Sequence, residues 1–207
     1  MRMRKSCRMM GSMSKRILII DGHPDPAPQR YIHAIAAAYG NEATSAGHEV
    51  RTIAVATLKF PVLRARADFE SIATCPIVEQ IQGDLTWCEH VVMIYTLWLG
   101  SLPALFNGLL EQVFRPFFVL TTPAPGGPVK KRLRGKSVRI IVTMMMPALV
   151  YRWYFGAHSL KCLKRNVLSF CGMRPIRSHL IGSVGIGSAE HHCRSLERIR
   201  RYARKAR

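Results

Sequence analysis

Residues 17–30 read Ile-Leu-Ile-Ile-Asp-Gly-His-Pro-Asp-Pro-Ala-Pro-Gln-Arg, a short apolar run followed by a proline-rich loop. An apolar run bounded by charged residues is typical of a strand buried on both faces of a parallel sheet. From Arg30 to Ala46 the apolar residues recur with the 3.6-residue period of a helix, and Gly47 follows as a C-cap. This segment therefore predicts a strand, an ordered loop and a helix, which is the first half of a βαβ unit.

The same alternation continues to the end of the chain. Further strands are predicted near 50–55, 90–97, 138–146 and 178–184, and further helices over 76–88, 103–118, 158–170 and 189–206. We expect Ser101 to be an N-cap, and Cys193, Leu196 and Ile199 to face inward from the last helix. Strand–helix alternation at this spacing predicts one α/β domain with a parallel sheet of five strands and helices on both faces. We expect this domain to span residues 14–207, after a tail at 1–13 that is disordered or reflects a misassigned start.

The composition favours a soluble, cytoplasmic protein. The chain has 207 residues, 48% of them hydrophobic, and no apolar run reaches the roughly 18 residues that a transmembrane helix needs. Its 6 cysteines include no C-x-x-C pair and no histidine partner at zinc spacing, so we expect no metal site. They are predicted to be reduced and mostly buried thiols, as in cytoplasmic proteins.

The formal net charge of +19 raises the question of an anionic partner. The basic residues cluster in 1–16, 130–139 and 194–207, which are the two ends of the chain and one loop. Tyr202 is the single aromatic residue interleaved with them. We therefore favour solvated ends and expect no nucleic-acid partner, with a nucleic-acid or membrane-system contact as the alternative.

Ligands of open parallel sheets bind at the carboxyl ends of the strands, which makes the loop 21–30 a candidate site. Its three prolines stiffen it, and the following helix offers unpaired N–H groups and partial positive charge. With His23, Gln29 and Arg30 as side-chain donors, this loop predicts a phosphate site without a glycine run. The alternative is a rigid connection with no ligand.

Two later strand ends suggest a flat, apolar ligand. Trp98 follows the third predicted strand, where it is either a wall for a ring system or part of the core. The segment 143–158 combines methionines, aromatic residues and His158, which suits a ring-binding wall or a subunit interface. The glycine-rich segment 182–187 follows the last strand rather than the first, so we interpret it as a turn that closes the sheet.

Residues 98–114 read Trp-Leu-Gly-Ser-Leu-Pro-Ala-Leu-Phe-Asn-Gly-Leu-Leu-Glu-Gln-Val-Phe. This stretch, together with the first strand and loop, resembles the NAD(P)H:quinone reductase family of flavodoxin-like fold. The resemblance covers nearly the whole chain from about Lys15. It implies a three-layer sandwich of strand order 2-1-3-4-5, bound FMN or FAD, NAD(P)H as co-substrate, a quinone-like acceptor and a homodimer.

The resemblance also implies roles for individual residues. His23, Gln29 and Arg30 would contact the flavin phosphate. The ring would be lined by Thr96, Leu97, Trp98, Leu99, Gly100, Thr143, Met144, Met145 and Met146. The tyrosine and histidine implicated in hydride transfer in the family correspond to Tyr151 and His158, with Tyr154 as an alternative to Tyr151. Family members usually carry a glycine where this chain has Met144 to Met146.

These observations lead to one functional hypothesis and two alternatives. The hypothesis is a flavin-dependent NAD(P)H oxidoreductase, in which a tyrosine–histidine pair stabilises charge on the reduced ring. One alternative is an electron carrier of the same fold, but such carriers tend to be acidic and lack the aromatic–histidine segment. The other is a non-enzymatic binding or regulatory module that uses the basic ends.

Overall fold

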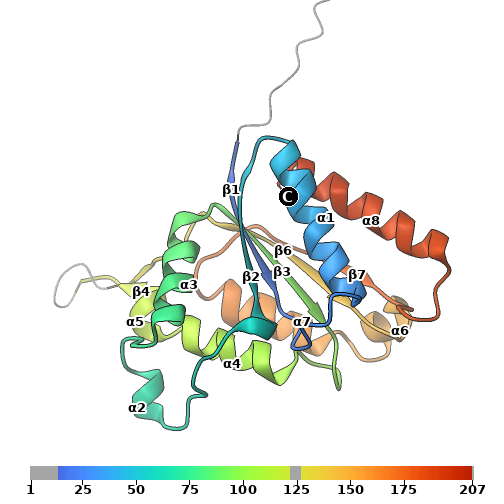
Figure 1. Cartoon of the computed structure of the whole chain (residues 1–207). Coiled ribbons are helices and arrows are strands. Elements are labelled where there is room, and N and C mark those ends of the chain that lie inside the picture. The colour runs from blue at the N-terminus through green and yellow to red at the C-terminus, as the bar shows by residue number, and fades with distance from the viewer. Residues whose placement is uncertain (1–13, 122–126, 207) are drawn as a thin grey trace, which may run out of the picture.

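The computed structural model describes residues 14–121 and 127–206, and its centre is a five-stranded parallel sheet (Figure 1). The strand order is β2 (Glu49–Ala54), β1 (Arg16–Asp21), β3 (His90–Thr96), β6 (Ser137–Thr143) and β7 (Ile176–Ile181). Counted along the chain, this is the order 2-1-3-4-5, so the predicted fold class is confirmed. The tail predicted for residues 1–13 lies outside the described residues.

The register aligns the carboxyl ends of the central strands at one edge of the sheet. Asp21 at the end of β1 pairs with Ile94, and Thr96 at the end of β3 pairs with Thr143 at the end of β6. The strand order reverses between β1 and β3, because β2 lies on one side of β1 and the later strands lie on the other. This edge is therefore the topological switch point, where ligands of such sheets bind.

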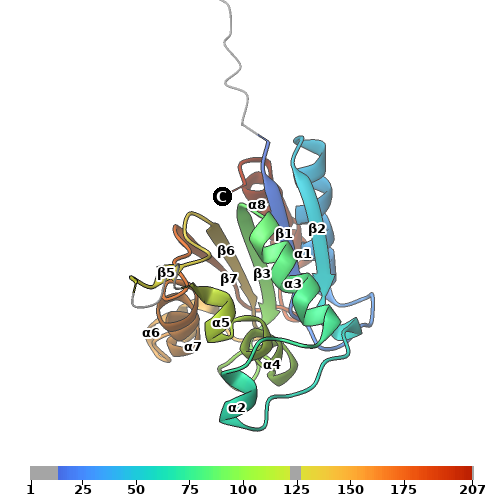
Figure 2. The same ribbon diagram turned by 90° about the vertical axis from the view of Figure 1, so that its left-hand side faces the viewer.

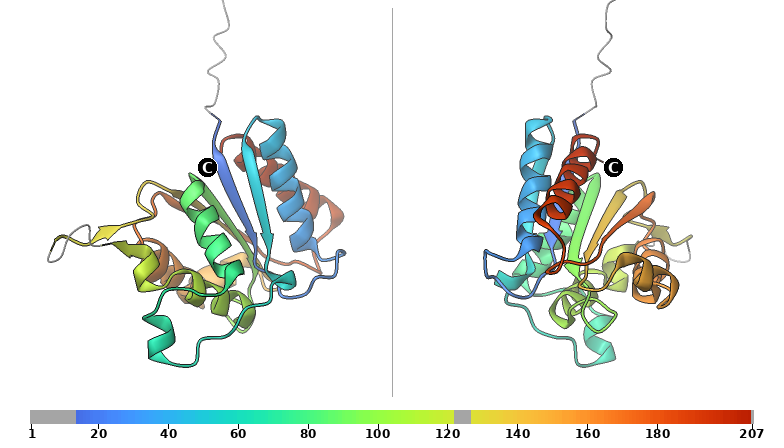
Figure 3. Two further views of the ribbon diagram at one scale, coloured as in Figure 1. Left: turned by 60° about the vertical axis from the view of Figure 1, so that its left-hand side comes forward. Right: turned by 90° about the vertical axis from the view of Figure 1, so that its right-hand side faces the viewer.

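Helices cover both faces of the sheet (Figures 2 and 3). One face carries α1 (Tyr31–Ser45) and α8 (Ala189–Arg204), and the other carries α3 (Pro76–Trp87), α4 (Ala104–Val113) and α7 (His158–Cys162) with the π-helical η2 (Leu163–Leu168). Alternation along β1 explains the two layers, because successive side chains of a strand point to opposite faces. Ile17 and Ile19 pack towards α1 and α8, whereas Leu18 and Ile20 pack towards α3 and α4.

The helix predicted over 103–118 is divided into α4 and α5 (Pro116–Val119). Arg115 is extended because the residue before a proline is disfavoured in helical geometry, and Pro116 then begins the new helix. The prediction of Ser101 as N-cap is wrong. The N-cap of α4 is Pro103, and Ser101 instead pairs with Trp98.

Other boundaries differ from the predictions, and so does the placement of one residue. The last strand, predicted over 178–184, is β7 at Ile176–Ile181. The fourth main strand, β6, ends at Thr143 rather than at residue 146, because the chain then turns towards α6 (Ala148–Trp153). The helix predicted over 158–170 changes to π geometry at Leu163 and ends at Leu168. Cys193 is exposed, since α8 packs on the sheet through Ile199 and Ala203.

Several short elements were not predicted, because they contain too few residues for a periodic pattern. They are η1 (Val55–Thr57), α2 (Arg66–Phe69), α6, and an antiparallel hairpin formed by β4 (Leu120–Thr121) and β5 (Lys130–Lys131). None of the helices in the described ranges combines the length and the apolar character needed to cross a bilayer.

The expectation of mostly buried thiols holds in part. Among the described cysteines Cys88 and Cys171 are buried, whereas Cys162 and Cys193 are exposed. Burial raises the pKa of Cys88 to about 11 and that of Cys171 to about 12, so these two thiols stay protonated at neutral pH.

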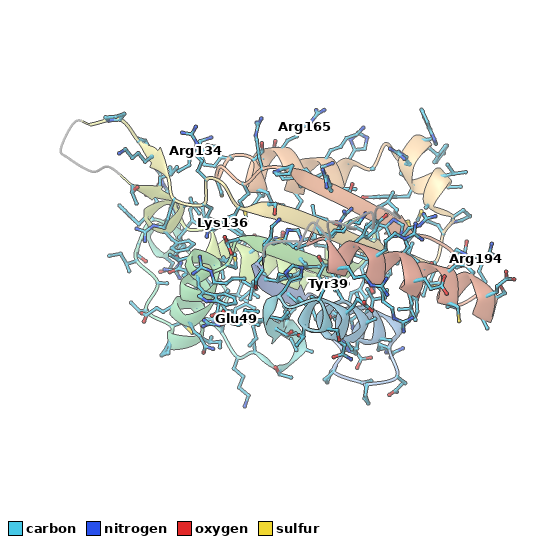
Figure 4. The ribbon with its side chains drawn as sticks, turned by 90° about the horizontal axis from the view of Figure 1, so that it is seen from above. Tyr39, Glu49, Arg134, Lys136, Arg165 and Arg194 are labelled. Atoms are coloured by element: carbon cyan, nitrogen blue, oxygen red, sulfur yellow. The ribbon has the colours of Figure 1, made fainter. Side chains whose placement is uncertain are left out.

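The cationic side chains are spread over the surface. Arg134 precedes β6, Arg165 belongs to η2 and Arg194 belongs to α8; in the view from above the first two lie along one side of the molecule and Arg194 lies towards one end (Figure 4). This distribution is typical of a solvated surface and gives the molecule a general attraction for anions.

Candidate functional site

A cavity of about 490 Å³ opens at the switch point, a volume in the usual range for small-molecule sites. Its lining comes from the loop after β1, the start of α1, the ends of β3 and β6, and the loop after β7. The lining residues are His23, Asp25, Gln29, Arg30, Tyr31, Ile32, Thr96, Trp98, Thr143, Met144, Met145 and Val184.

Most of the residues singled out from the sequence lie in this lining. The exceptions among the proposed ligand contacts are Leu97, Leu99, Gly100 and Met146, which do not line it. Leu97 and Met146 pack against the core, and Leu99 and Gly100 form an exposed turn beside Trp98.

Sequence reasoning missed Asp25, Tyr31, Ile32 and Val184. Tyr31 and Ile32 begin α1, so the predicted start of this helix was the feature of the sequence that could have identified them. Val184 belongs to the glycine-rich segment that we interpreted as a closing turn, and its N–H donates to the carbonyl of Met144 at 3.0 Å. Asp25 carries a negative charge, which does not fit the donor pattern of a phosphate site, so the pattern gave no signal for it.

One end of the cavity is suited to an anion. α1 begins at Tyr31, its N-cap Arg30 makes no side-chain cap, and its first turn contains no acidic residue. The first N–H groups of a helix have no partner within the helix and carry partial positive charge. Gln29 and Arg30 add side-chain donors at the same place, so this end forms an anion-binding pole.

The loop 21–30 is held by Asp21 and His33. One carboxylate oxygen of Asp21 accepts the N–H of His23 at 3.2 Å, and the other lies 2.5 Å from Nδ1 of His33. Nε2 of His33 lies 2.9 Å from the carbonyl oxygen of Asp25, so both ring nitrogens face acceptors. Burial alone would lower the pKa of His33, but the hydrogen bonds that its ring donates to the Asp21 carboxylate and the Asp25 carbonyl oxygen raise the pKa above its usual value.

This arrangement predicts a pH-dependent contribution to stability. Because the pKa of His33 is raised in the folded state, its contribution is fully present below pH 6.5 and is lost as pH rises through the raised pKa. We expect wild type to exceed His33→Gln in unfolding free energy by about 1 kcal/mol at pH 6, with the difference shrinking at higher pH. Urea titrations of both proteins across this range measure it, and a difference that does not vary with pH contradicts it.

The ring of His23 is also fixed by the loop. Its Nδ1 lies 3.0 Å from the backbone nitrogen of Asp25 and 3.2 Å from the carbonyl oxygen of the same residue. Trp98 stands edge-on to this ring, with centroids 5.8 Å apart and planes at 80°. The loop after β1 and the loop after β3 therefore meet through these two rings.

The other end of the cavity is suited to a flat ring with a polar edge. The hydroxyl oxygens of Thr96 and Thr143 lie 2.9 Å apart across β3 and β6. Met144 is buried, Met145 is exposed, and Trp98 supplies an indole that is 47% exposed. The N–H of Met145 donates no hydrogen bond to any backbone group of the described residues. This wall combines polarisable surface with hydroxyl and N–H groups.

Trp98 is carried by a tight turn. Trp98 and Ser101 exchange both backbone hydrogen bonds, at 3.0 and 2.8 Å. Leu99 and Gly100 between them have φ values of +46° and +76°, as in a type I′ turn. Gly100 adopts this geometry without steric cost, whereas Leu99 is a non-glycine residue in the left-handed region, fully exposed at the side of the cavity.

A second cavity of about 700 Å³ lies between α4 and the α7–η2 segment, and it is mostly apolar. Ser101 and His158 contribute to its lining, whereas Trp98, hydrogen-bonded to Ser101, lines the first cavity. The structure therefore places His158 in the lining of this second cavity rather than in that of the switch-point cavity. Tyr151 is buried and its hydroxyl shares a hydrogen bond of 2.8 Å with Ser159, while Tyr154 is 83% exposed. The catalytic roles of Tyr151 and His158 stay predictions.

The sheet order and the cavity at its switch point define a doubly wound α/β protein with a cavity of small-molecule size at the carboxyl ends of its strands. Residues 15–205 match the family of proteins with a flavodoxin-like fold, and the chain belongs to this family. A search among curated proteins finds no match.

Solved structures with the same fold are numerous. A NAD(P)H:quinone oxidoreductase from Methanothermobacter marburgensis superposes with a TM-score of 0.78 at 14% identity, over 94% of this chain and 100% of that one. An FMN-dependent NADH-azoreductase from Bacillus anthracis, solved in complex with FMN, gives 0.73 at 12% identity, over 91% and 97%. An NADPH-quinone reductase from P. pentosaceus gives 0.59 at 18% identity, over 92% and 98%. At these identities the likeness establishes the fold.

Proposed function

We propose that this protein is a flavin-dependent NAD(P)H oxidoreductase that reduces a quinone or a similar acceptor. The observation that carries the proposal is the switch-point cavity, which joins an anion-binding pole to a flat, polarisable wall. The names of similar structures support it, since they include an NAD(P)H:quinone oxidoreductase and an azoreductase holding FMN.

The residues of the cavity fit a flavin, either FMN or FAD. The phosphate would be held by the first-turn N–H groups of α1 with Gln29, Arg30 and His23. The ring would be held by Thr96, Trp98, Thr143, Met144 and Met145. When bound, the flavin supplies the hydride chemistry, accepting from NAD(P)H and passing on to the acceptor.

The protein's own groups orient the ligand and exclude water. The paired hydroxyls of Thr96 and Thr143 offer a donor and an acceptor to a polar ring edge. Trp98 and Met144 cover apolar surface, which lowers the local dielectric constant and strengthens nearby hydrogen bonds. The net charge of +19 attracts polyanionic NADPH, an effect that weakens as salt concentration rises.

We further propose that His158 stabilises negative charge during the reaction from the neighbouring cavity. The support is that His158 and Ser101 line the same cavity, because Ser101 is hydrogen-bonded to Trp98 in the lining of the switch-point cavity. Tyr151 would act as a positioning residue, since its hydroxyl is bonded to Ser159 in the first turn of α7. Tyr154, which is exposed, is the alternative tyrosine.

The experiment follows NADH and NADPH oxidation by the purified protein with FMN or FAD and a soluble quinone. We expect oxidation that requires both flavin and protein, and direct reduction of the flavin by NAD(P)H in stopped-flow absorbance. A protein that binds flavin but takes no hydride from NAD(P)H would instead be an electron carrier. One that binds no flavin but binds DNA in a salt-dependent way would be a binding module.

We also propose a homodimer, in agreement with the resemblance. The support is an exposed apolar surface on α6 and the turn after it, formed by Leu149, Trp153, Tyr154 and Phe155. A cluster of this kind usually marks an interaction site rather than plain surface.

The described cysteines form no disulfide, which supports the proposed cytoplasmic location.

Trp153→Lys tests the dimer, because it places a charge on this apolar surface. We expect wild type to have twice the chain mass of 23.3 kDa in light scattering and the variant to have the chain mass itself. Ile72→Lys is the control, since Ile72 is similarly exposed near α2, and it should remain dimeric. A monomeric wild type at micromolar concentration contradicts the proposal.

A further inference from the structure

The anion-binding pole already contains an anion. Asp25 lines the switch-point cavity together with Gln29, Arg30 and the first residues of α1. One of its carboxylate oxygens accepts the N–H of Ala27 at 2.9 Å. The other accepts Nε of Arg30 at 2.7 Å and lies 2.5 Å from Nη2 of the same side chain.

These partners are the ones that a phosphate would use. Phosphate oxygens accept hydrogen bonds from backbone N–H groups near a helix start and from the paired N–H groups of a guanidinium. The hydrogen bond from Ala27, and after it the one from Arg30, hold the pKa of Asp25 below its usual value. The carboxylate is therefore charged at neutral pH and engages the donors that would neutralise a ligand's phosphate.

The loop offers little to replace these donors. Pro24, Pro26 and Pro28 lack N–H groups, so every second residue of the segment 24–28 has no backbone donor. The N–H of Asp25 donates to His23 and that of Ala27 donates to Asp25. A phosphate at this pole would depend on His23, Gln29, the first turn of α1 and an Arg30 that is paired with a carboxylate.

We propose that Asp25 is an internal competitor for the phosphate subsite, which lowers affinity for phosphate-bearing flavins relative to the uncharged flavin, riboflavin. This inference rests on the proposed function, because it concerns the same cavity. Two like charges a few ångströms apart repel each other, and the repulsion is moderated by solvent at this partly exposed site. The charge of the carboxylate does not affect how the rest of the cavity binds the ring.

Asp25→Asn tests the proposal, since the amide keeps the shape and an acceptor oxygen for Ala27 but removes the charge. FMN and riboflavin are titrated into wild type and variant by quenching of flavin fluorescence. We expect FMN to bind the variant about tenfold more tightly than wild type. Riboflavin should bind the two proteins equally, and the FMN gain should shrink at high salt.

Glu70→Gln is the matched control. Glu70 forms an exposed pair with Arg66 at 2.7 Å in the α2 region, outside the cavity lining, so the substitution makes the same change in net charge. It should leave the affinities for FMN and riboflavin as they are in wild type. If Asp25→Asn fails to fold, Asp25→Ser replaces it, because serine also accepts a hydrogen bond from the residue two positions on.

The outcomes separate this inference from the proposed function. Weaker FMN binding by Asp25→Asn would overturn it and make Asp25 a residue that positions Arg30 for the phosphate. Equal gains for FMN and riboflavin would overturn it as well, since the effect would not concern phosphate. Flavin binding by wild type with no change in Asp25→Asn rejects the inference alone, whereas no binding of either flavin by any variant rejects both.

Discussion

Replacing Gly182 with alanine is expected to lower the free energy of unfolding by about 3 kcal/mol, the upper part of the range for overpacking. Gly182 follows β7, and a Cβ at this position would overlap the backbone nitrogen of Ala148 and lie 2.8 Å from the carbonyl oxygen of Met146. These are backbone atoms, so no side-chain rotation relieves the overlap. The loop is also tied in place, because the N–H of Ser183 donates to the same carbonyl at 3.1 Å.

Urea unfolding of Gly182→Ala measures this loss. Gly83→Ala is the control, because Gly83 lies within α3 and a Cβ there meets nothing within 4 Å. This control should be stabilised by about 0.5–1 kcal/mol, the usual preference for alanine over glycine in a helix. A Gly182→Ala protein as stable as wild type would show that the loop after β6 yields more easily than these contacts indicate.

Replacing Trp98 with alanine is expected to weaken flavin binding by about tenfold or more, since stacking on an aromatic side chain contributes about 1–3 kcal/mol for each base. Trp98 is half-exposed on the wall of the cavity, held edge-on to His23. Its removal leaves the ring end of the cavity without its aromatic surface. The fold should be little affected, because the turn that carries Trp98 is closed by backbone hydrogen bonds with Ser101.

Trp87→Ala is the matched control for this experiment. Trp87 ends α3 near the amino ends of the strands, where the guanidinium of Arg51 lies 4.0 Å from its ring centroid. Titration of both variants with FMN should show a loss of affinity in Trp98→Ala and wild-type affinity in Trp87→Ala. Equal affinities in the two variants would mean that the ring does not lie against Trp98.

The sheet could be predicted from the sequence because its strands are short, continuous apolar runs. The run Ile17 to Ile20 is buried on both faces and remains recognisable without tertiary information. The helix ends were less predictable. Pro116 ends the predicted helix over 103–118 early, and α7 changes to π geometry at Leu163 for reasons that no local pattern records.

The site was partly predictable for a similar reason. The rule that ligands bind at strand ends located the loop 21–30 and the residues Thr96, Trp98 and Thr143. Val184 was not predictable, because it reaches the cavity through a hydrogen bond to Met144 from a distant part of the chain. The role of Asp25 depends on how its carboxylate folds back onto Ala27 and Arg30, which the sequence does not reveal.

The central claim is that the switch-point cavity holds a flavin, and the visible absorption spectrum tests it most directly. The purified protein is incubated with FMN or FAD, passed through a desalting column to remove free flavin, and its spectrum is recorded before and after addition of NAD(P)H. The account predicts a yellow protein whose flavin absorbance is bleached by NAD(P)H and recovers when a quinone is added. A protein that stays colourless after incubation with both flavins and does not oxidise NAD(P)H in their presence would contradict it.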